Sequence, residues 1–251
     1  MDHNGYLALV LHAHLPFVRH PEHEDFLEEG WLYEAITETY LPLLELMENW
    51  TRDGVEWKLT MSLTPTLCSM LSDELLQERY VRHIEQLTRL AEAEVERTST
   101  TPKYHNSAQM YLRVFTECRE AFINRYQRDL ISGFRKFQES GNLEIITCSA
   151  THGYMPLMKE FPEAVKAQVS VGVDHYRKMF GRDPRGIWNA ECGYFPGLDK
   201  TLAEQGLKFF FTDSHGLLFA TTRPRWGVFA PMETPSGVVA FGRDQESSRA
   251  V

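Results

Sequence analysis

Residues 6–14 read YLALVLHAH, a short apolar run followed directly by two histidines. A continuous apolar run of this length is typical of a strand that is buried on both faces of a parallel sheet. We therefore predict a strand from Tyr6 to Leu11, with His12 and His14 at its carboxyl end. Residues two apart in extended backbone point to the same side, so we expect both imidazoles to face one cavity.

The same pattern recurs along the chain. Further strands are predicted at 57–63, 143–148, 186–188 and 208–212, and helices at 31–50, 162–180 and 198–206. The turn sequence Pro235-Ser236-Gly237 within 227–241 predicts a β-hairpin. Strands that alternate with helices imply a parallel sheet, either closed as a barrel or open and doubly wound.

Polar residues that follow the strands favour the barrel. Each group follows a different strand, and the set is His12, His14, His152, Glu191, Asp213 and His215. A barrel gathers its site from the carboxyl ends of many strands, whereas an open sheet concentrates ligands at one switch point. We predict one α/β barrel domain over 1–251, with a helical insertion at about 73–141 that the segment 98–102 divides into two long helices.

Composition disfavours several classes of function. The 251 residues are 43% hydrophobic and 24% charged, as in an ordinary soluble domain, and the formal net charge is -9. This acidity argues against a nucleic-acid partner, because such binding depends on Lys and Arg contacts to phosphate. The sequence has no GxGxxG or GxxxxGK[ST] motif, so we expect no nucleotide cofactor.

Cysteine spacing and the N-terminal residues indicate the compartment. Cys68, Cys118, Cys148 and Cys192 form no CxxC pair, which favours reduced thiols over a disulfide framework. Residues 1–6 carry no basic region, and the apolar run at 7–11 is too short for a signal peptide or a membrane span. We expect a cytoplasmic protein with no membrane partner.

Glu191 is the strongest candidate for a catalytic group. It lies in the segment WNAECGY, residues 188–194, where Trp188 and Tyr194 bracket a carboxylate that we expect to be part-buried. A sugar ring has an apolar C–H face and a polar rim, so aromatic rings beside a carboxylate suit a carbohydrate. The alternative is a buried structural carboxylate paired with an arginine such as Arg185.

The remaining polar residues leave the chemistry open. His152 stands beside Gly153, and Tyr154 could stack on a sugar ring. Asp213, close to His215, offers either a second carboxylate or a cap for the following turn.

The imidazoles allow two further interpretations. The histidine pair could be hydrogen-bonded for structural reasons alone. A four-ligand metal site is also possible, and with it a metal-dependent hydrolase or carbohydrate deacetylase. Its ligands would be His12, His14, His152 and Asp213.

Four separated segments resemble one known family when taken together. They are HAHLP (12–16), ATHGY (150–154), WNAECGY (188–194) and FTDSHG (211–216). In this order and spacing the chain closely resembles glycoside hydrolase family 57, and in particular its 1,4-α-glucan branching enzymes. The resemblance implies an incomplete (β/α)7 barrel, without metal or cofactor, that acts on α-glucan by a retaining double displacement.

The resemblance also implies roles. Glu191 corresponds to the family nucleophile, and His12, His14 and His152 correspond to histidines that line the donor subsite. Glu191 would attack the anomeric carbon, and a glucan 6-hydroxyl would then take the chain and form an α-1,6 branch. With water or a 4-hydroxyl as acceptor, the same site would serve an α-amylase or a 4-α-glucanotransferase.

The second catalytic group is missing from the resemblance. Retention requires another carboxyl group roughly 5–5.5 Å from the nucleophile. In family members this acid/base Asp lies in a later motif, well beyond Asp213, whereas the present sequence stops at Val251. We expect a truncated catalytic domain, without the last strands and the helical domain, that has little or no branching activity alone. A non-catalytic glucan-binding module is the alternative.

Overall fold

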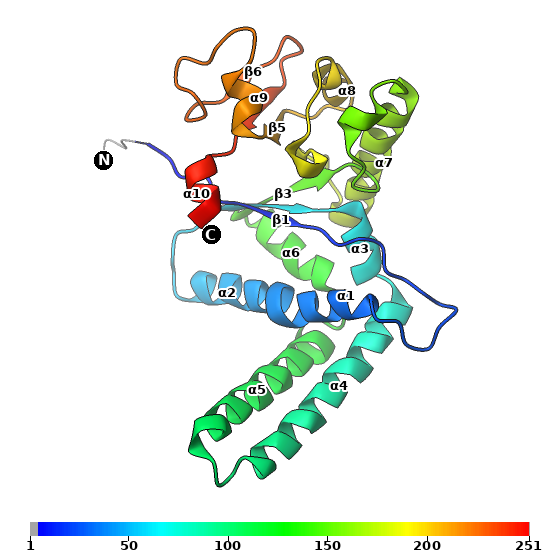
Figure 1. Cartoon of the computed structure of the whole chain (residues 1–251), viewed down its shortest axis with the longest axis vertical. Coiled ribbons are helices and arrows are strands. Elements are labelled where there is room, and N and C mark those ends of the chain that lie inside the picture. The colour runs from blue at the N-terminus through cyan, green and yellow to red at the C-terminus, as the bar shows by residue number, and fades with distance from the viewer. Residues whose placement is uncertain (1–4, 251) are drawn as a thin grey trace. The chain divides into compact units, whose positions relative to one another are not determined.

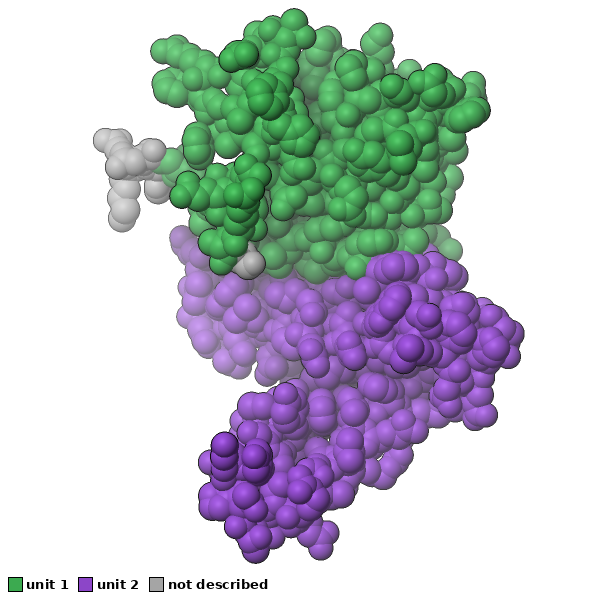
Figure 2. Space-filling view, in the orientation of Figure 1, with its two compact units in different colours: residues 1–14, 59–68, 143–251 green, residues 15–58, 69–142 purple. Residues whose placement is uncertain are grey.

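The computed structural model describes residues 5–250 as a mixed α/β fold (Figure 1). The chain divides into two compact units, which Figure 2 colours separately. Unit 1 comprises the residues up to 14 together with 59–68 and 143–251, and unit 2 comprises 15–58 and 69–142. The predicted helical insertion therefore shares its unit with residues 15–58. The first four residues and Val251, on which the expectations about a signal peptide and the chain end partly rest, lie outside the described residues.

Unit 1 is built on a seven-stranded sheet in the order β1-β2-β3-β4-β5-β7-β6. Neighbouring strands are parallel except for β6, which is antiparallel to β7. Within residues 5–250 the sheet stays open between β1 and β6, so the predicted incomplete α/β barrel is confirmed. The strands are β1 (Val10–Ala13), β2 (Leu59–Leu63), β3 (Leu143–Cys148), β4 (Gly186–Trp188), β5 (Phe209–Thr212), β6 (Met232–Glu233) and β7 (Val239–Gly242).

Two strand predictions need correction. The first strand begins at Val10 and includes His12, because its pairing with β2 starts there, whereas Tyr6 and Leu7 are 94% and 92% exposed. The predicted hairpin exists as the β6–β7 pair, but β7 also pairs in parallel with β5 and is therefore a barrel strand. Alternation along a single segment shows which residues share a face and does not reveal a second pairing partner.

Apolar layers cover both faces of the sheet. Phe210 of β5 packs with Val169 and Val173 of helix α7, whereas the next residue, Phe211, packs with Trp188 of β4. This division follows from strand geometry, since successive side chains point to opposite faces. The helices of unit 1 after β3 are α7 (Pro162–Phe180), α8 (Leu198–Glu204), α9 (Ser214–Leu218) and α10 (Gln245–Ala250).

Helix α7 lies unusually close to β3. A Cβ atom at Gly172 would stand 2.3 Å from the carbonyl oxygen of Cys148, so the approach requires glycine. The Tyr176 hydroxyl donates to the Ile145 carbonyl at 2.8 Å, and the Thr147 hydroxyl donates to the Gly172 carbonyl at 3.0 Å. The strand that leads to His152 is thereby fixed against its helix.

Unit 2 is helical. A π-helical turn, η1 (Ile36–Tyr40), interrupts the predicted helix at 31–50 just before Pro42, whose missing amide hydrogen removes one backbone hydrogen bond. None of the helices within residues 5–250 is long and apolar enough to cross a membrane. The helices are α1 (Glu29–Ala35), α2 (Leu41–Arg52), α4 (Glu74–Arg97), α5 (Pro102–Glu120), η2 (Ala121–Arg125) and α6 (Leu130–Glu139), while α3 (Pro65–Leu71) begins in unit 1.

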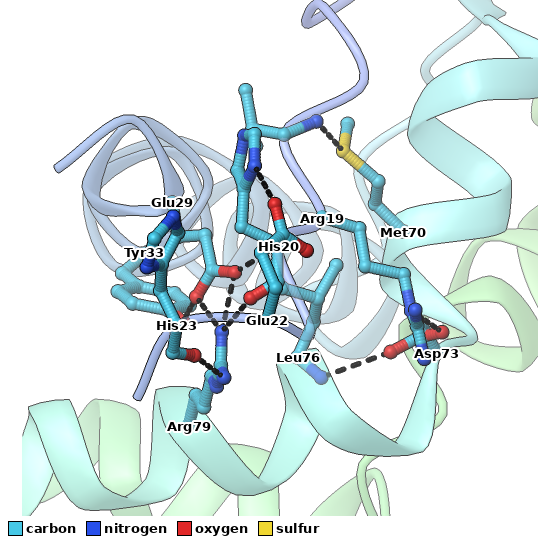
Figure 3. Close-up of polar contacts among 11 residues, drawn as sticks. Arg19, His20, Glu22, His23, Glu29, Tyr33, Met70, Asp73, Leu76 and Arg79 are labelled. Atoms are coloured by element: carbon cyan, nitrogen blue, oxygen red, sulfur yellow. Dashed lines mark hydrogen bonds and ion pairs between the residues drawn. The ribbon is translucent and has the colours of Figure 1, made fainter. Parts of the chain in front are cut away.

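A buried ion pair joins α1 to α4 (Figure 3). Arg79 Nη1 donates to both carboxylate oxygens of Glu29, at 2.5 and 2.7 Å, and the Tyr33 hydroxyl donates to the same carboxylate at 2.8 Å. The guanidinium also donates to the backbone carbonyls of His20 and His23. One arginine on α4 therefore holds both α1 and the segment that precedes it.

All four cysteines are buried, and in the described chain none forms a disulfide. Burial raises the pKa of the Cys68 and Cys148 thiols to about 12 and that of Cys118 to about 11. Burial also raises the pKa of Cys192. The thiols are therefore protonated inside the fold.

Replacing Arg79 should destabilise unit 2. Arg79→Met leaves the Glu29 carboxylate buried and unpaired, so we expect the free energy of unfolding to fall by about 3–5 kcal/mol. Urea unfolding followed by circular dichroism measures this loss. In the control, Arg177→Met, only exposed ion pairs with Asp174 and Asp183 are lost, so the free energy of unfolding should change little. Equal small losses in both variants would contradict a stabilising role for the buried pair.

Candidate functional site

Most of the predicted polar residues lie at the carboxyl ends of the strands of unit 1. His12 is in β1 and His14 follows it, His152 comes after β3, Glu191 after β4, and Asp213 directly after β5. Because parallel strands end at one edge of the sheet, side chains far apart in sequence can meet there.

His12 is at the centre of this group. Its Nδ1 lies 2.5 Å from the hydroxyl of Ser62, the residue opposite it in the β1–β2 register, and its Nε2 lies 3.0 Å from Nε2 of His152. Between two neutral imidazoles one nitrogen must donate and the other must accept. The tautomers of His12 and His152 are therefore coupled, and the buried Ser62 hydroxyl takes the complementary role.

The rings form a stack. His14 and His152 lie face to face, with ring centroids 3.7 Å apart and an interplanar angle of 11°, and His12 lies 4.6 Å from Trp188 at 14°. His14 Nδ1 is 3.2 Å from the Thr64 hydroxyl. The expectation that His12 and His14 face the same way agrees with their near-parallel rings, whose centroids are 6.0 Å apart.

The three imidazoles are neutral at pH 7. Burial lowers the pKa of His12 to about 3 and that of His14 to about 4, and in both cases the neighbouring His152 lowers it further. Burial also lowers the pKa of His152, although the charge of Glu191 opposes this. A neutral imidazole can donate one hydrogen bond and accept another, which suits hydroxylated ligands.

The backbone is strained at three residues of the candidate site. His152, Glu191 and Cys192 have φ values of 55°, 52° and 55°, in the left-handed region that side chains rarely adopt. Cys192 N donates to the Asn189 carbonyl at 2.8 Å, and the Thr212 hydroxyl donates to the Cys192 carbonyl at 3.2 Å. Such strain costs about 1–3 kcal/mol per residue and clusters at functional sites.

Glu191 is exposed, so the expectation of a part-buried carboxylate is wrong. The left-handed turn directs its side chain outward, whereas the adjacent Cys192 is buried. Among residues 5–250 it has no ion-pair or hydrogen-bond partner, and Arg185 pairs instead with Glu144 at 3.2 Å. The carboxylate is still close enough to His152 to oppose the lowering of its pKa.

Asn189 is a candidate that the sequence interpretation missed. It is fully buried, yet within the described chain neither Oδ1 nor Nδ2 has a hydrogen-bond partner, and the same holds for Nε1 of the adjacent Trp188. Unsatisfied buried polar atoms are uncommon and call for an explanation. The free amide of Asn189, two residues before Glu191, could hydrogen-bond to a ligand. The sequence did contain a signal for Asn189, namely its position between the end of β4 and Glu191.

Arg243 was also missed. It follows β7, and its Nη1 lies 3.4 Å from Asp213 Oδ1 while its guanidinium lies 5.9 Å from the Trp188 ring centroid. Asp213 occupies the position before α9 but makes no capping hydrogen bond through its side chain. The signal for Arg243 depended on recognising β7 as a barrel strand.

Tyr194 does not join the imidazole group. Its ring stacks on Phe210 at 5.3 Å and 9°, and its hydroxyl donates to Asp199 at 3.3 Å. Phe210 belongs to the layer that packs against α7, whereas Trp188 belongs to the layer on the opposite face. The two aromatic residues that bracket Glu191 in sequence therefore lie on different faces of the sheet.

Tyr154 and His215 are both exposed. The Tyr154 ring packs closely over Gly193, where a Cβ atom would stand 2.5 Å from it. His215 lies on α9 and, in the part of the chain that the structure describes, contacts none of the three imidazoles. Tyr154 is thus next to the Glu191 segment, and His215 is not grouped with the cluster.

The histidine geometry does not converge on a metal position. Within residues 5–250, no group of three His, Cys, Asp or Glu side chains is placed to hold a metal ion. The lone pairs of His14 and His152 lie in stacked planes, so they cannot both point at one ion about 2 Å away. Asp213, the fourth suggested ligand, pairs with Arg243. The arrangement therefore favours a hydroxylated ligand over a metal ion.

Sequence comparisons agree on the family. A model of glycosyl hydrolase family 57 matches residues 8–251. A 1,4-α-glucan branching enzyme of Thermococcus kodakarensis is 36% identical over 279 residues, which cover 98% of this chain and 40% of that protein. A probable 1,4-α-glucan branching enzyme of Mycobacterium tuberculosis is 28% identical over 262 residues, covering 98% and 48%. The chain thus spans less than half the length of these relatives.

Similar solved structures differ in the activity for which they are named. An α-amylase from Thermotoga maritima superposes with a TM-score of 0.93 at 50% identity, covering 97% of this chain and 46% of that one. A branching enzyme of this family from Pyrococcus horikoshii gives 0.90 at 32% identity, covering 98% and 48%.

The low pKa values of His12 and His14 predict sensitivity to acid. A histidine whose folded pKa lies below its unfolded value of 6.5 gains a proton on unfolding, so its contribution to instability grows as the pH falls from 6.5 towards about 4 and 3. His14→Gln removes one such group, and we expect its Tm to fall less than that of the wild type between pH 6.5 and 4. Thermal denaturation measures both slopes. A wild-type slope for His14→Gln would contradict the prediction.

Proposed function

Because the chain belongs to glycosyl hydrolase family 57, we propose that its histidine-lined rim binds an α-1,4-glucan and that Glu191 is the nucleophile of a retaining transfer. One observation carries this proposal. The unpaired carboxylate of Glu191 projects from a strained turn beside a stack of neutral imidazoles. An unpaired anion next to neutral donors and acceptors is what attack on a sugar requires.

His12, His14 and His152 form the donor subsite in this proposal. Their neutral rings offer both donors and acceptors to the hydroxyl groups of one glucose unit. Trp188 supports the stack from beneath His12, and the exposed ring of Tyr154 is available for stacking on a sugar.

The reaction proceeds by double displacement. Glu191 attacks the anomeric carbon, the glycosidic bond breaks, and a glycosyl-enzyme ester remains until an acceptor oxygen displaces it. The departing oxygen needs a proton from a second carboxyl group roughly 5–5.5 Å away. Asp213 is engaged by Arg243, so we assign this acid to the part of the family's length that the present chain does not span.

The acceptor distinguishes two candidate activities. We propose a glucan 6-hydroxyl, which yields α-1,6 branches, because the curated relatives are named branching enzymes. The α-amylase from Thermotoga maritima, at 50% identity, favours water as a second candidate. Both activities use the same donor side and the same nucleophile. We propose a cytoplasmic location, because four free cysteines are typical of a protein from a reducing compartment.

A substrate that needs no acid tests the nucleophile directly. Fluoride leaves without protonation, so the 251-residue chain should release fluoride from α-maltosyl fluoride even if its hydrolysis of amylose is slow. Glu191→Gln should lower this release by roughly 10³-fold or more, measured with a fluoride electrode, while maltoheptaose affinity stays within about twofold. Asp213→Asn is the matched control and should retain release. Undiminished release by Glu191→Gln would show that another group attacks the sugar.

Products from amylose identify the acceptor and locate the acid. We expect little turnover by this chain, because protonation of the departing oxygen is slow without the second carboxyl group. Loss of iodine absorbance, with α-1,6 anomeric signals by proton NMR, reports branching, whereas new reducing ends report hydrolysis. Rapid turnover that disappears in Asp213→Asn would show that the second carboxylate lies in this chain.

A further inference from the structure

The hairpin of α4 and α5 carries a groove that the proposed site does not use. Residues 98–101 connect the two helices, which run side by side within unit 2 (Figure 1). The groove between them has a volume of about 390 Å³, within the range of roughly 300–1,000 Å³ that small-molecule sites occupy. Its apolar lining includes Leu87, Leu90, Ala91, Tyr104, Tyr111 and Phe115.

Large side chains in this groove remain in contact with solvent. Leu90, Tyr104 and Tyr111 are each at least half exposed, at 59%, 57% and 50%. Tyr111 and Phe115 lie one helical turn apart with ring centroids at 5.6 Å, so they form a continuous aromatic surface. Contiguous exposed apolar surface with a polar border marks a binding site more often than a single exposed residue does.

The polar border of the groove is electrically balanced. Arg97 donates to both carboxylate oxygens of Glu94, at 2.8 and 2.6 Å, and these are the two charged residues among those that line the groove. Ser107 adds a hydroxyl to the same border. A self-compensated pair complements a neutral ligand, since an anion or a cation would have to compete with the existing partner.

We propose that this groove is a second, non-catalytic binding site for α-1,4-glucan, an inference that rests on the proposed substrate class. The apolar C–H faces of successive glucose units would lie on Tyr104 and Tyr111, and hydroxyl groups would hydrogen-bond to Glu94, Arg97 and Ser107. Such a site holds a polymer close to the enzyme and raises its effective concentration at the rim. It therefore affects long substrates and leaves short ones unchanged.

Affinity electrophoresis through gels containing amylopectin tests this inference. The net charge of -9 drives the chain through the gel, and Tyr104→Ala/Tyr111→Ala leaves that charge unchanged. His12→Ala should disable glucan binding at the proposed donor subsite of His12, His14 and His152. In this background we expect the gel still to retard the protein. Adding the tyrosine changes should raise the apparent dissociation constant about tenfold, as the loss of two stacking contacts predicts.

Two controls accompany the experiment. Phe161→Ala removes an exposed aromatic ring from unit 1 and should leave retardation unchanged. The tyrosine variant, with His12 intact, should release fluoride from α-maltosyl fluoride at the wild-type rate, which also shows that it is folded.

Three results would overturn the inference. If the tyrosine variant is retarded as strongly as its parent, glucan binds at another place than this groove. The proposed function would still stand in that case if fluoride release persists. A chain that is not retarded at all lacks the second site, and if it also releases no fluoride the proposed function fails as well. Sedimentation that shows a wild-type dimer, a monomeric tyrosine variant and equal glucan affinity would identify the groove as a contact between copies of this chain.

Discussion

Parallel pairing of the strands is the constraint on which the site depends. The strand register places His12 opposite Ser62 and Trp188 opposite Phe211. Strand pairing, and not nearness in sequence, therefore brings the hydroxyl, imidazole and indole groups together. Because the strands run in one direction, their following loops begin at a common edge. A slip of one residue in β1 would turn His12 to the other face and remove it from the stack.

The sequence predicts those parts of the site that depend on apolar strands. The predictions that His14, His152 and Glu191 follow strand ends are confirmed, because buried parallel strands read as distinct apolar runs, whereas His12 lies inside β1. Their roles in catalysis and binding stay predictions, since those depend on a bound glucan.

The remaining parts depend on information that periodicity does not contain. The sequence does not predict Arg243 as a site residue, because the residues before it read as half of a hairpin, whereas the parallel pairing of β7 with β5 makes that strand part of the barrel. Trp188 and Tyr194 are expected from the sequence to bracket the Glu191 carboxylate, but they lie on different faces of the sheet, with the left-handed residues Glu191 and Cys192 between them. The same turn explains why Glu191 is exposed, and non-glycine residues give no signal of such a conformation in sequence.

Because every thiol is buried, the folded chain should react little with alkylating reagents. The thiolate is the reactive form of cysteine. Burial raises the pKa to about 11 for Cys118 and to about 12 for Cys68 and Cys148, so these groups stay protonated at neutral pH. Cys118 belongs to unit 2, and the other cysteines to unit 1. Alkylation mapped by mass spectrometry would therefore record which half of the molecule opens first, using residues already present in the chain.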